Sequence, residues 1–161
     1  MNWLSIIPIG FLATVVFTSI MFASQGLRWT RMSLPFMLGT MLTPRRQFAK
    51  GVGSGLHLLG GWAFAFVYAW LFETIQLVTW WLGGLFGLTH GLFMLTTALP
   101  MLPVVHPRMA DEDQGPTPTR QLEPPGFLAL NYGRRTPLVT LFAHMAYGLI
   151  VGVFYQLVQQ G

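Results

Sequence analysis

The chain has 161 residues, of which 53% are hydrophobic and only 9% are charged, and its formal net charge is +4. Soluble domains carry about 25% charged residues, so this chain has too little charge to cover a surface that faces water. The composition argues against a soluble enzyme, a disordered chain and a nucleic-acid-binding protein, and it indicates a polytopic membrane protein. The chain has no cysteine, which excludes disulfides, thiolate metal sites and covalently attached c-type haem.

Four apolar runs are long enough to cross a bilayer, which takes about 20 helical residues. We expect membrane spans at about 3–24, 51–73, 79–102 and 136–158. The first run has no Lys or Arg before it, which favours a retained helix over a signal peptide. Pro100 and Pro103 are expected to end the third span. The sequence therefore predicts an all-α fold, with residues 1–161 forming a single transmembrane domain of four helices in an antiparallel bundle.

The connections between these runs differ in character. Residues 33–42 are apolar but too short to span, so we expect an interfacial or re-entrant segment there. The link from Glu73 to Val78 is short, which predicts a tight antiparallel hairpin of the second and third spans. Residues 103–135 are rich in proline and charge and are expected to form a cytoplasmic loop.

All nine Lys and Arg residues lie in the first and third connections. Because basic residues are retained on the cytoplasmic side, both termini are expected on the non-cytoplasmic side of a cell inner membrane. Basic side chains beside helix ends contact anionic lipid headgroups and set topology. Those assigned this role are Arg28, Arg31, Arg45, Arg46, Lys50, Arg134 and Arg135.

A weak internal repeat relates the second and fourth spans at a constant offset of 87 residues. An Arg-Arg pair precedes each set of matched positions. A duplication would place two hairpins in the same orientation about an axis along the membrane normal, whereas a chance match would leave the two halves unrelated. The matched positions are His57 with His144, Gly61 with Gly148, and Tyr68 with Tyr155.

Glycines recur at helical spacing in the expected spans. Lipid removes the hydrophobic drive for helix association, so close contact through small residues takes its place. These rows either hold the four helices of one chain together or dock a partner subunit. The glycines assigned to helix contacts are Gly10, Gly55, Gly83, Gly87, Gly91, Gly148 and Gly152.

Three histidines, His57, His90 and His144, lie inside expected spans at comparable depths. Ionisable groups in a membrane are costly and are usually functional, and neutral imidazole is a common metal and haem ligand. One interpretation is hydrogen bonding between helices. A second is a cofactor site, either a b-type haem held by His57 and His144 or a metal ion held by all three. A proton or quinone pathway is a third.

The fourth histidine, His106, lies in the third connection beside three acidic residues at 111–113. One histidine with three acids is able to hold a divalent cation, but the spacing matches no defined metal loop. A solvated charged loop is the preferred interpretation.

No catalytic motif and no pair of intramembrane carboxylates is visible in the sequence. Several features together resemble small uncharacterised four-helix proteins of the bacterial inner membrane: Gly-Phe-Leu-Ala-Thr at 10–14, the His57 helix, the glycine-rich His90 helix, His-Pro-Arg at 106–108, and His-x-x-Tyr-Gly at 144–148. This resemblance implies no activity and no functional residues.

We expect a non-catalytic membrane subunit that assembles with other membrane subunits or with copies of itself, in the lipid bilayer and without nucleic acid. The buried histidines suggest electron-transfer machinery as the larger complex. The alternative function is a small membrane cytochrome or metal-binding protein that uses these histidines.

Overall fold

The computed structural model describes residues 3–111 and 115–160, and within them it contains helices and no β-strand. This confirms the predicted all-α class. The elements are α1 (Trp3–Gly26), α2 (Leu34–Leu42), α3 (Arg46–Ile75), α4 (Trp80–Phe93), the π-helix η1 (Met94–Ala98), α5 (Leu99–Val105), the 3₁₀ helix η2 (Phe127–Tyr132) and α6 (Thr136–Gln160). Four helical stretches are long and apolar enough to cross a membrane, namely α1, α3, the continuous run from α4 through α5, and α6.

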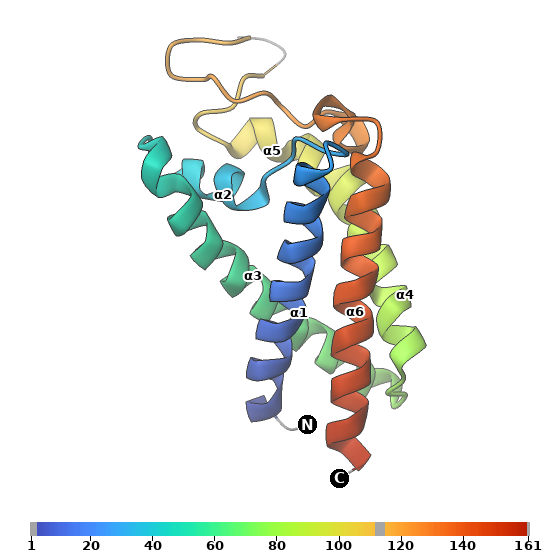
Figure 1. Cartoon of the computed structure of the whole chain (residues 1–161). Coiled ribbons are helices and arrows are strands. Elements are labelled where there is room, and N and C mark those ends of the chain that lie inside the picture. The colour runs from blue at the N-terminus through green and yellow to red at the C-terminus, as the bar shows by residue number, and fades with distance from the viewer. Residues whose placement is uncertain (1–2, 112–114, 161) are drawn as a thin grey trace.

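α6 packs against both α4 and α1, α1 packs against α3, and α3 crosses behind α1 and α6 (Figure 1). The expected tight hairpin of the second and third spans is wrong, because the backbone of α4 packs against α6 rather than against α3. Their connection is short, with Gln76 in the left-handed conformation at its start, but the two backbones diverge. Aromatic side chains bridge them: Phe72 contacts Phe86 with 5.2 Å between ring centroids.

Close contact between α4 and α6 rests on glycines from both helices. A Cβ added at Gly83 or Gly87 would collide with the backbone of α6, and one at Gly148 or Gly152 would collide with the backbone around α4. Gly91 lies against the His144 side chain. These five glycines form one seam, so the hairpin partner of α4 in space is α6.

The other glycines divide into buried and open positions. Gly10 of α1 lies against Trp62 and Ala65 of α3. Gly55 meets nothing within 4 Å, so of the two roles expected for the glycine rows it does not serve a contact within this chain; it faces outward because α3 turns its opposite side to α1 and α2. Two glycines that were not expected at a helix contact, Gly39 and Gly53, allow α2 to lie directly on the backbone of α3.

The third span continues through both prolines, whereas the sequence analysis expected it to end at 102. It runs from Trp80 to Val105. Proline lacks a backbone N–H and its ring clashes with the carbonyl one turn earlier. The π-helical turn before Pro100 relieves this conflict, because it shifts the bonding pattern so that the Leu99 N–H donates to the Met94 carbonyl.

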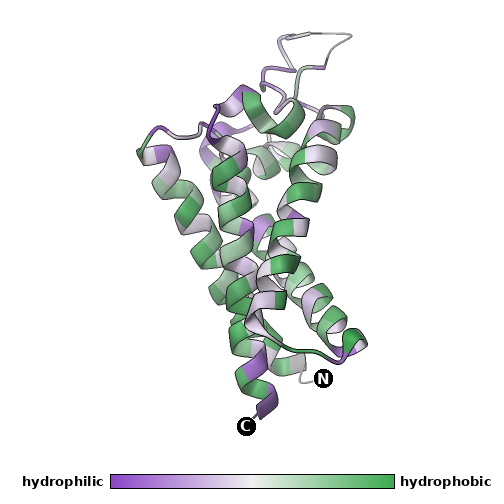
Figure 2. Ribbon diagram, turned by 90° about the vertical axis from the view of Figure 1, so that its right-hand side faces the viewer, coloured by the Kyte–Doolittle hydropathy of each residue, from purple (hydrophilic) through white to green (hydrophobic). Residues whose placement is uncertain are grey.

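Charge and hydropathy are segregated along the helix axes. The first residues of α1 and the last residues of α6 lie at one end of the molecule, and the loops that carry the basic residues lie at the other (Figure 1). Figure 2 shows mostly hydrophobic residues along the long helices and hydrophilic ones mainly toward the two ends. Trp70, Trp80 and Trp81 are exposed near the end that holds the termini, the position of an interfacial aromatic belt.

A cap of short elements covers the end opposite the termini. Residues 34–42, expected as an interfacial or re-entrant segment, form the helix α2, which rests on the first half of α3. The loop after α5 and the helix η2 complete the cap (Figure 1). α3 begins at Arg46 rather than at 51, so its first turn with its basic side chains belongs to this end of the molecule.

Candidate functional site

Three histidines from three different helices lie close together around Phe17 of α1. The rings of His90 on α4 and His144 on α6 meet edge to face, with 4.7 Å between their centroids. The Phe17 ring lies 4.8 Å from the His144 ring and 5.3 Å from the His57 ring. The structure therefore brings together the histidines that the sequence analysis singled out, with an aromatic residue that it did not single out between them.

Two of these imidazoles have hydrogen-bond partners. His144 Nδ1 lies 2.8 Å from the Thr140 carbonyl oxygen, and because a carbonyl only accepts, the ring donates from Nδ1 and keeps a lone pair on Nε2. The Tyr68 hydroxyl lies 3.2 Å from His90 Nδ1. Of the expected interhelical bonds, the structure contains the one that joins α3 to α4 through Tyr68, while His144 bonds within its own helix.

His57 differs from the other two. Its Nε2 atom is buried and has no hydrogen-bond partner among the described residues. A buried polar atom without a partner costs free energy, because it has lost its bonds to water and gained none in return. Such atoms are rare in folded proteins, so His57 points to something that the chain by itself does not provide.

A cavity of about 230 Å³ adjoins the three histidines. Aromatic rings from α1, α3 and α6 form much of its wall, including Phe17, Phe64 and Tyr147. Among the described residues, none that lines it carries a formal charge. An apolar cavity with a few convergent polar groups is the usual form of a small-molecule site.

A second, wider hollow reaches His57 from the outer surface of the helices. It has a volume of about 540 Å³ and lies between α1 and the first half of α3. Phe11 and Phe22, both exposed, stand on its α1 side. His57 and Thr14 line both this groove and the inner cavity, so the two hollows meet at these side chains.

The residues present do not fit the cofactors considered in the sequence analysis. Axial imidazoles bind a metal through bonds of about 2 Å, but the Phe17 ring packs against both His57 and His144. The cavity of about 230 Å³ is also smaller than the roughly 300–1,000 Å³ of sites for drug-sized ligands, and a haem is larger than these. Within the described residues, no group of three His, Asp or Glu side chains is placed to hold a metal ion.

His106 has a structural place in the cap, and the expected solvated loop is wrong at this residue. Its side chain is only 1% exposed. Nδ1 accepts the Arg108 backbone N–H at 3.1 Å, so Nε2 carries the proton and donates to the Met37 carbonyl at 3.0 Å. With both nitrogens engaged, His106 is not available to a divalent cation. Of the neighbouring acids, Glu112 and Asp113 lie outside the described residues.

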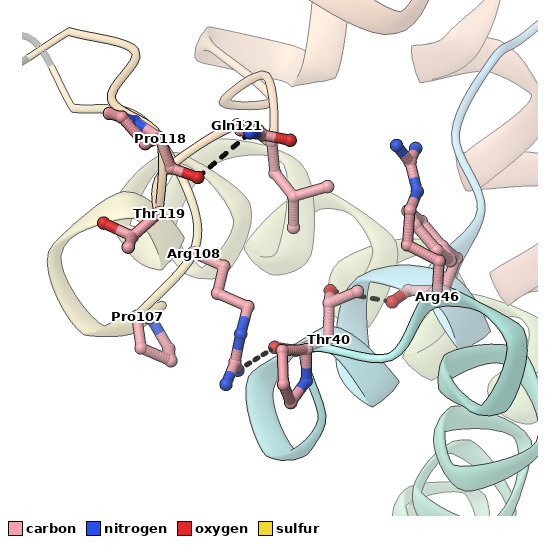
Figure 3. A pocket seen from close by; sticks show the side chains of 10 residues that line it. Thr40, Arg46, Pro107, Arg108, Pro118, Thr119 and Gln121 are labelled. Carbon is pink, nitrogen blue, oxygen red and sulfur yellow. Dashed lines mark hydrogen bonds between the residues drawn. The ribbon is translucent and has the colours of Figure 1, made fainter.

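Arg108 ties the same loop to the C-terminal end of α2 and borders an open pocket. Its guanidinium donates to the carbonyl oxygens of Thr40 at 2.6 Å and Met41 at 3.2 Å. The pocket has a volume of about 410 Å³, and Arg46 lines it on the α3 side (Figure 3). Two guanidinium groups beside one opening at this end of the molecule favour an anionic group, such as a lipid phosphate.

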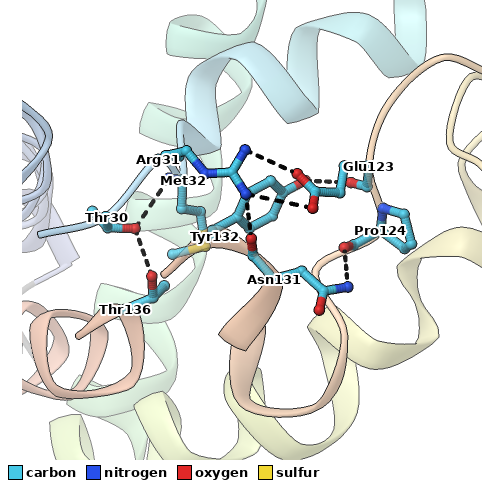
Figure 4. Close-up of polar contacts among 8 residues, drawn as sticks. All are labelled: Thr30, Arg31, Met32, Glu123, Pro124, Asn131, Tyr132 and Thr136. Atoms are coloured by element: carbon cyan, nitrogen blue, oxygen red, sulfur yellow. Dashed lines mark hydrogen bonds and ion pairs between the residues drawn. The ribbon is translucent and has the colours of Figure 1, made fainter. Parts of the chain in front are cut away.

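A second polar cluster joins the loop before η2 to the chain between α1 and α2 (Figure 4). The Arg31 guanidinium donates to the Asn131 carbonyl at 2.5 Å and pairs with the Glu123 carboxylate at 3.2 Å. The Tyr132 hydroxyl donates to the Glu123 backbone carbonyl. Burial raises the pKa of Tyr132 to about 12; the Glu123 carboxylate also raises it, and Arg31 lowers it.

All seven basic residues assigned to lipid headgroups are exposed: Arg28, Arg31, Arg45, Arg46, Lys50, Arg134 and Arg135. Two of them also pack on aromatic rings, Arg46 over Phe36 and Arg135 over Trp29. Arg31 has the additional structural role described above, which the sequence analysis did not foresee because its partners lie about 100 residues away.

Comparison of the chain with protein-family models, with curated proteins and with solved structures finds no match. Its membrane-protein character therefore rests on the four apolar helices themselves.

Proposed function

We propose that this protein is a non-catalytic subunit of the cell inner membrane that associates with a larger membrane assembly through the outer face of α3. The termini lie on the non-cytoplasmic side and the basic cap faces the cytoplasm, in keeping with the positive-inside rule. The proposal rests on a difference in contacts: Gly51 and Gly55 of α3 touch no other helix of the chain, whereas the glycines of the α4–α6 seam do.

Gly51 and Gly55 lie one turn apart on α3, and both are exposed. A Cβ at either position meets nothing within 4 Å, whereas every glycine of the α4–α6 seam already touches a neighbouring helix. A glycine pair at this spacing lets a second helix approach closely, and such pairs are characteristic of helix association in membranes. Glycine in a helix also costs up to about 1 kcal/mol relative to alanine, and at Gly51 and Gly55 no helix contact within this chain offsets that cost.

The least buried helices, α3 and the run from α4 through α5, offer the free surface for such an assembly. In the most apolar stretches of α3 and of the run from α4 through α5, 22% and 17% of residues are buried within the protein, compared with 39% for α1 and 50% for α6. A subunit that packs against others is expected to leave part of its helix surface uncovered in this way. A homo-oligomer through the same α3 face is the simplest form of the assembly.

Native mass measurement after gentle solubilisation tests this proposal. We expect the protein to leave the membrane with partner chains or with further copies of itself. Gly55→Leu should release it as a monomer, because the larger side chain blocks close helix approach, whereas Gly55→Ala should retain most of the assembly. A monomer from the unaltered protein, or an assembly indifferent to Gly55→Leu, would contradict the proposal.

The alternative function, a small cytochrome or metal protein, is tested by the same preparation. The geometry around Phe17 argues against it, so we expect a colourless sample without stoichiometric metal. A Soret band that shifts on reduction, lost in His144→Leu, would overturn this conclusion.

A further inference from the structure

The unpartnered nitrogen of His57 and the two hollows that meet beside it point to a ligand from the bilayer. His57 Nε2 is buried without a partner among the described residues. The groove between α1 and α3 opens on the outer surface of the long helices, beside the exposed side chains Phe11 and Phe22. A molecule that reaches His57 by this route comes from the hydrocarbon phase rather than from water.

The walls restrict the chemistry of that molecule. Among the described residues, neither the inner cavity nor the groove is lined by a charged side chain, whereas Lys50 lines a third hollow of about 180 Å³ that also reaches His57. Inside the inner cavity, a phosphate or carboxylate head would therefore have no counter-charge in a medium of low dielectric. The inner cavity is small, about 230 Å³. It therefore suits a neutral head of about one ring in size, with an apolar tail left in the groove.

The aromatic surroundings favour a planar head. The Phe64 ring is tilted by 30° to the His90 ring, with 3.8 Å between centroids, and Phe17 lies between His57 and His144. Such faces contact a flat ring through stacked or edge-on arrangements. A neutral imidazole at His57 donates from Nε2 in one of its two tautomers, and a ring carbonyl is the matching acceptor.

We propose that the cavity beside His57 binds the head of a quinone-type lipid, whose carbonyl accepts a hydrogen bond from His57 Nε2 while its tail lies in the groove between α1 and α3. The site is a binding site, and no electron or proton transfer is assigned to it. The proposal does not depend on the assembly through Gly55, which lies outside both hollows.

Gly60 provides a test that leaves the histidines untouched. It lines the inner cavity, and a Cβ there meets nothing within 4 Å, so Gly60→Leu should fill the cavity without disturbing the fold. The matched control is Ala63→Leu on the same helix, because Ala63 is exposed and lines neither hollow. His57→Leu removes the hydrogen bond itself.

The experiment is calorimetric titration of the full chain in detergent micelles with a decyl-substituted benzoquinone, with empty micelles as the blank. We expect saturable binding of about one quinone per chain. Gly60→Leu and His57→Leu should each weaken it about tenfold or more, the effect of losing one buried hydrogen bond or the space for the ring. Ala63→Leu should bind within about twofold of the unaltered chain.

Three results would overturn the proposal. The first is the absence of saturable binding to the unaltered chain. The second is equal binding by the Gly60→Leu variant, which would place the quinone elsewhere on the protein or in the micelle. The third is full binding by a folded His57→Leu variant, which would show that the quinone does not depend on a hydrogen bond from His57. If His57→Leu does not fold, Gly60→Leu and Ala63→Leu still decide between the outcomes.

Discussion

A single methyl group added at Gly148 tests whether the α4–α6 seam holds the helices together. A Cβ at Gly148 would lie 2.9 Å from the Gly83 carbonyl carbon and 2.9 Å from the Gly87 nitrogen. Carbon contacts are favourable at about 3.5–4.0 Å, and the Gly83 carbonyl oxygen lies closer still to the added Cβ, so the two backbones must separate by more than about 1 Å. Because the opposing atoms are backbone, no side chain is able to rotate away.

The backbone clash at Gly148 sets the expected loss of stability in Gly148→Ala. Overpacking of a close contact costs about 1–3 kcal/mol, and in a membrane little hydrophobic gain offsets the lost contacts. At Gly55 the same methyl group meets open space, and alanine is favoured over glycine in a helix by up to about 1 kcal/mol. Because the helix-propensity gain of Gly→Ala is common to both variants, Gly148→Ala should be less stable than Gly55→Ala by the cost of overpacking, a difference of roughly 1–3 kcal/mol.

Equilibrium unfolding in mixed micelles of rising dodecyl sulfate content, followed by tryptophan fluorescence, measures this difference. The two variants change the same residue type by the same group, so intrinsic helix propensity cancels between them. If Gly148→Ala were as stable as Gly55→Ala, the close approach of α4 and α6 would not contribute to stability as argued.

Two further predictions concern the cap. His106→Ala leaves the Arg108 N–H without its partner and removes one of the donors to the Met37 carbonyl, which Thr40 Oγ1 also bonds. This loss costs about 1–3 kcal/mol, so limited proteolysis should cut the loop after α5 faster; unchanged cleavage would show that His106 does not hold this loop against α2. In the folded protein Tyr132 has a pKa of about 12 and keeps its proton up to that pH, whereas an unfolded chain releases it near pH 10. Its link to the Glu123 carbonyl is then fully present below about pH 10 and is lost as the pH rises through about 12. The phenolate absorbance of the unaltered chain minus that of Tyr132→Phe should titrate near 12, and a midpoint near 10 would refute the burial of this phenol.

The sequence predicted the features that depend on local composition. Long apolar runs without charge require helices in a bilayer, and all four candidate spans were found with their ends within a few residues. The third span ended too early in the prediction, because a π-helical turn accommodates Pro100. A single-sequence pattern does not reveal such a local rearrangement, since proline normally interrupts a helix at that point.

The sequence did not predict which surfaces meet. The glycine rows on the third and fourth spans were visible, but periodicity gives only the face of each helix, and the short link after Glu73 suggested α3 rather than α6 as the partner of α4. Gly39 escaped notice because it lies in a segment too short to span a membrane, and Gly53 because it falls outside the four-residue spacing of Gly51 and Gly55. His106 was expected in a solvated loop because its partner Met37 is distant in sequence.

The contact between α2 and α3 connects these separate features. Gly39 and Gly53 hold α2 against the first half of α3, and two residues of α2, Leu34 and Leu38, form a wall of the cavity beside His57. A helix too short to cross the membrane therefore forms part of the wall of the inner cavity between the long helices. Displacing α2 should open the cavity without touching any histidine.

Gly53→Ala provides that displacement. A Cβ at Gly53 would lie 2.6 Å from the Gly39 nitrogen, so α2 has to move outward. The chain has no cysteine, so a Met37→Cys variant carries a single reactive thiol. Met37 is only 4% exposed in the folded cap, so this thiol should react slowly unless α2 moves. Maleimide should label this cysteine several-fold faster in the Gly53→Ala background than in Gly51→Ala, where the added methyl meets open space. Equal labelling in both backgrounds would show that α2 does not depend on the glycine contact, and the cavity wall would then need another support.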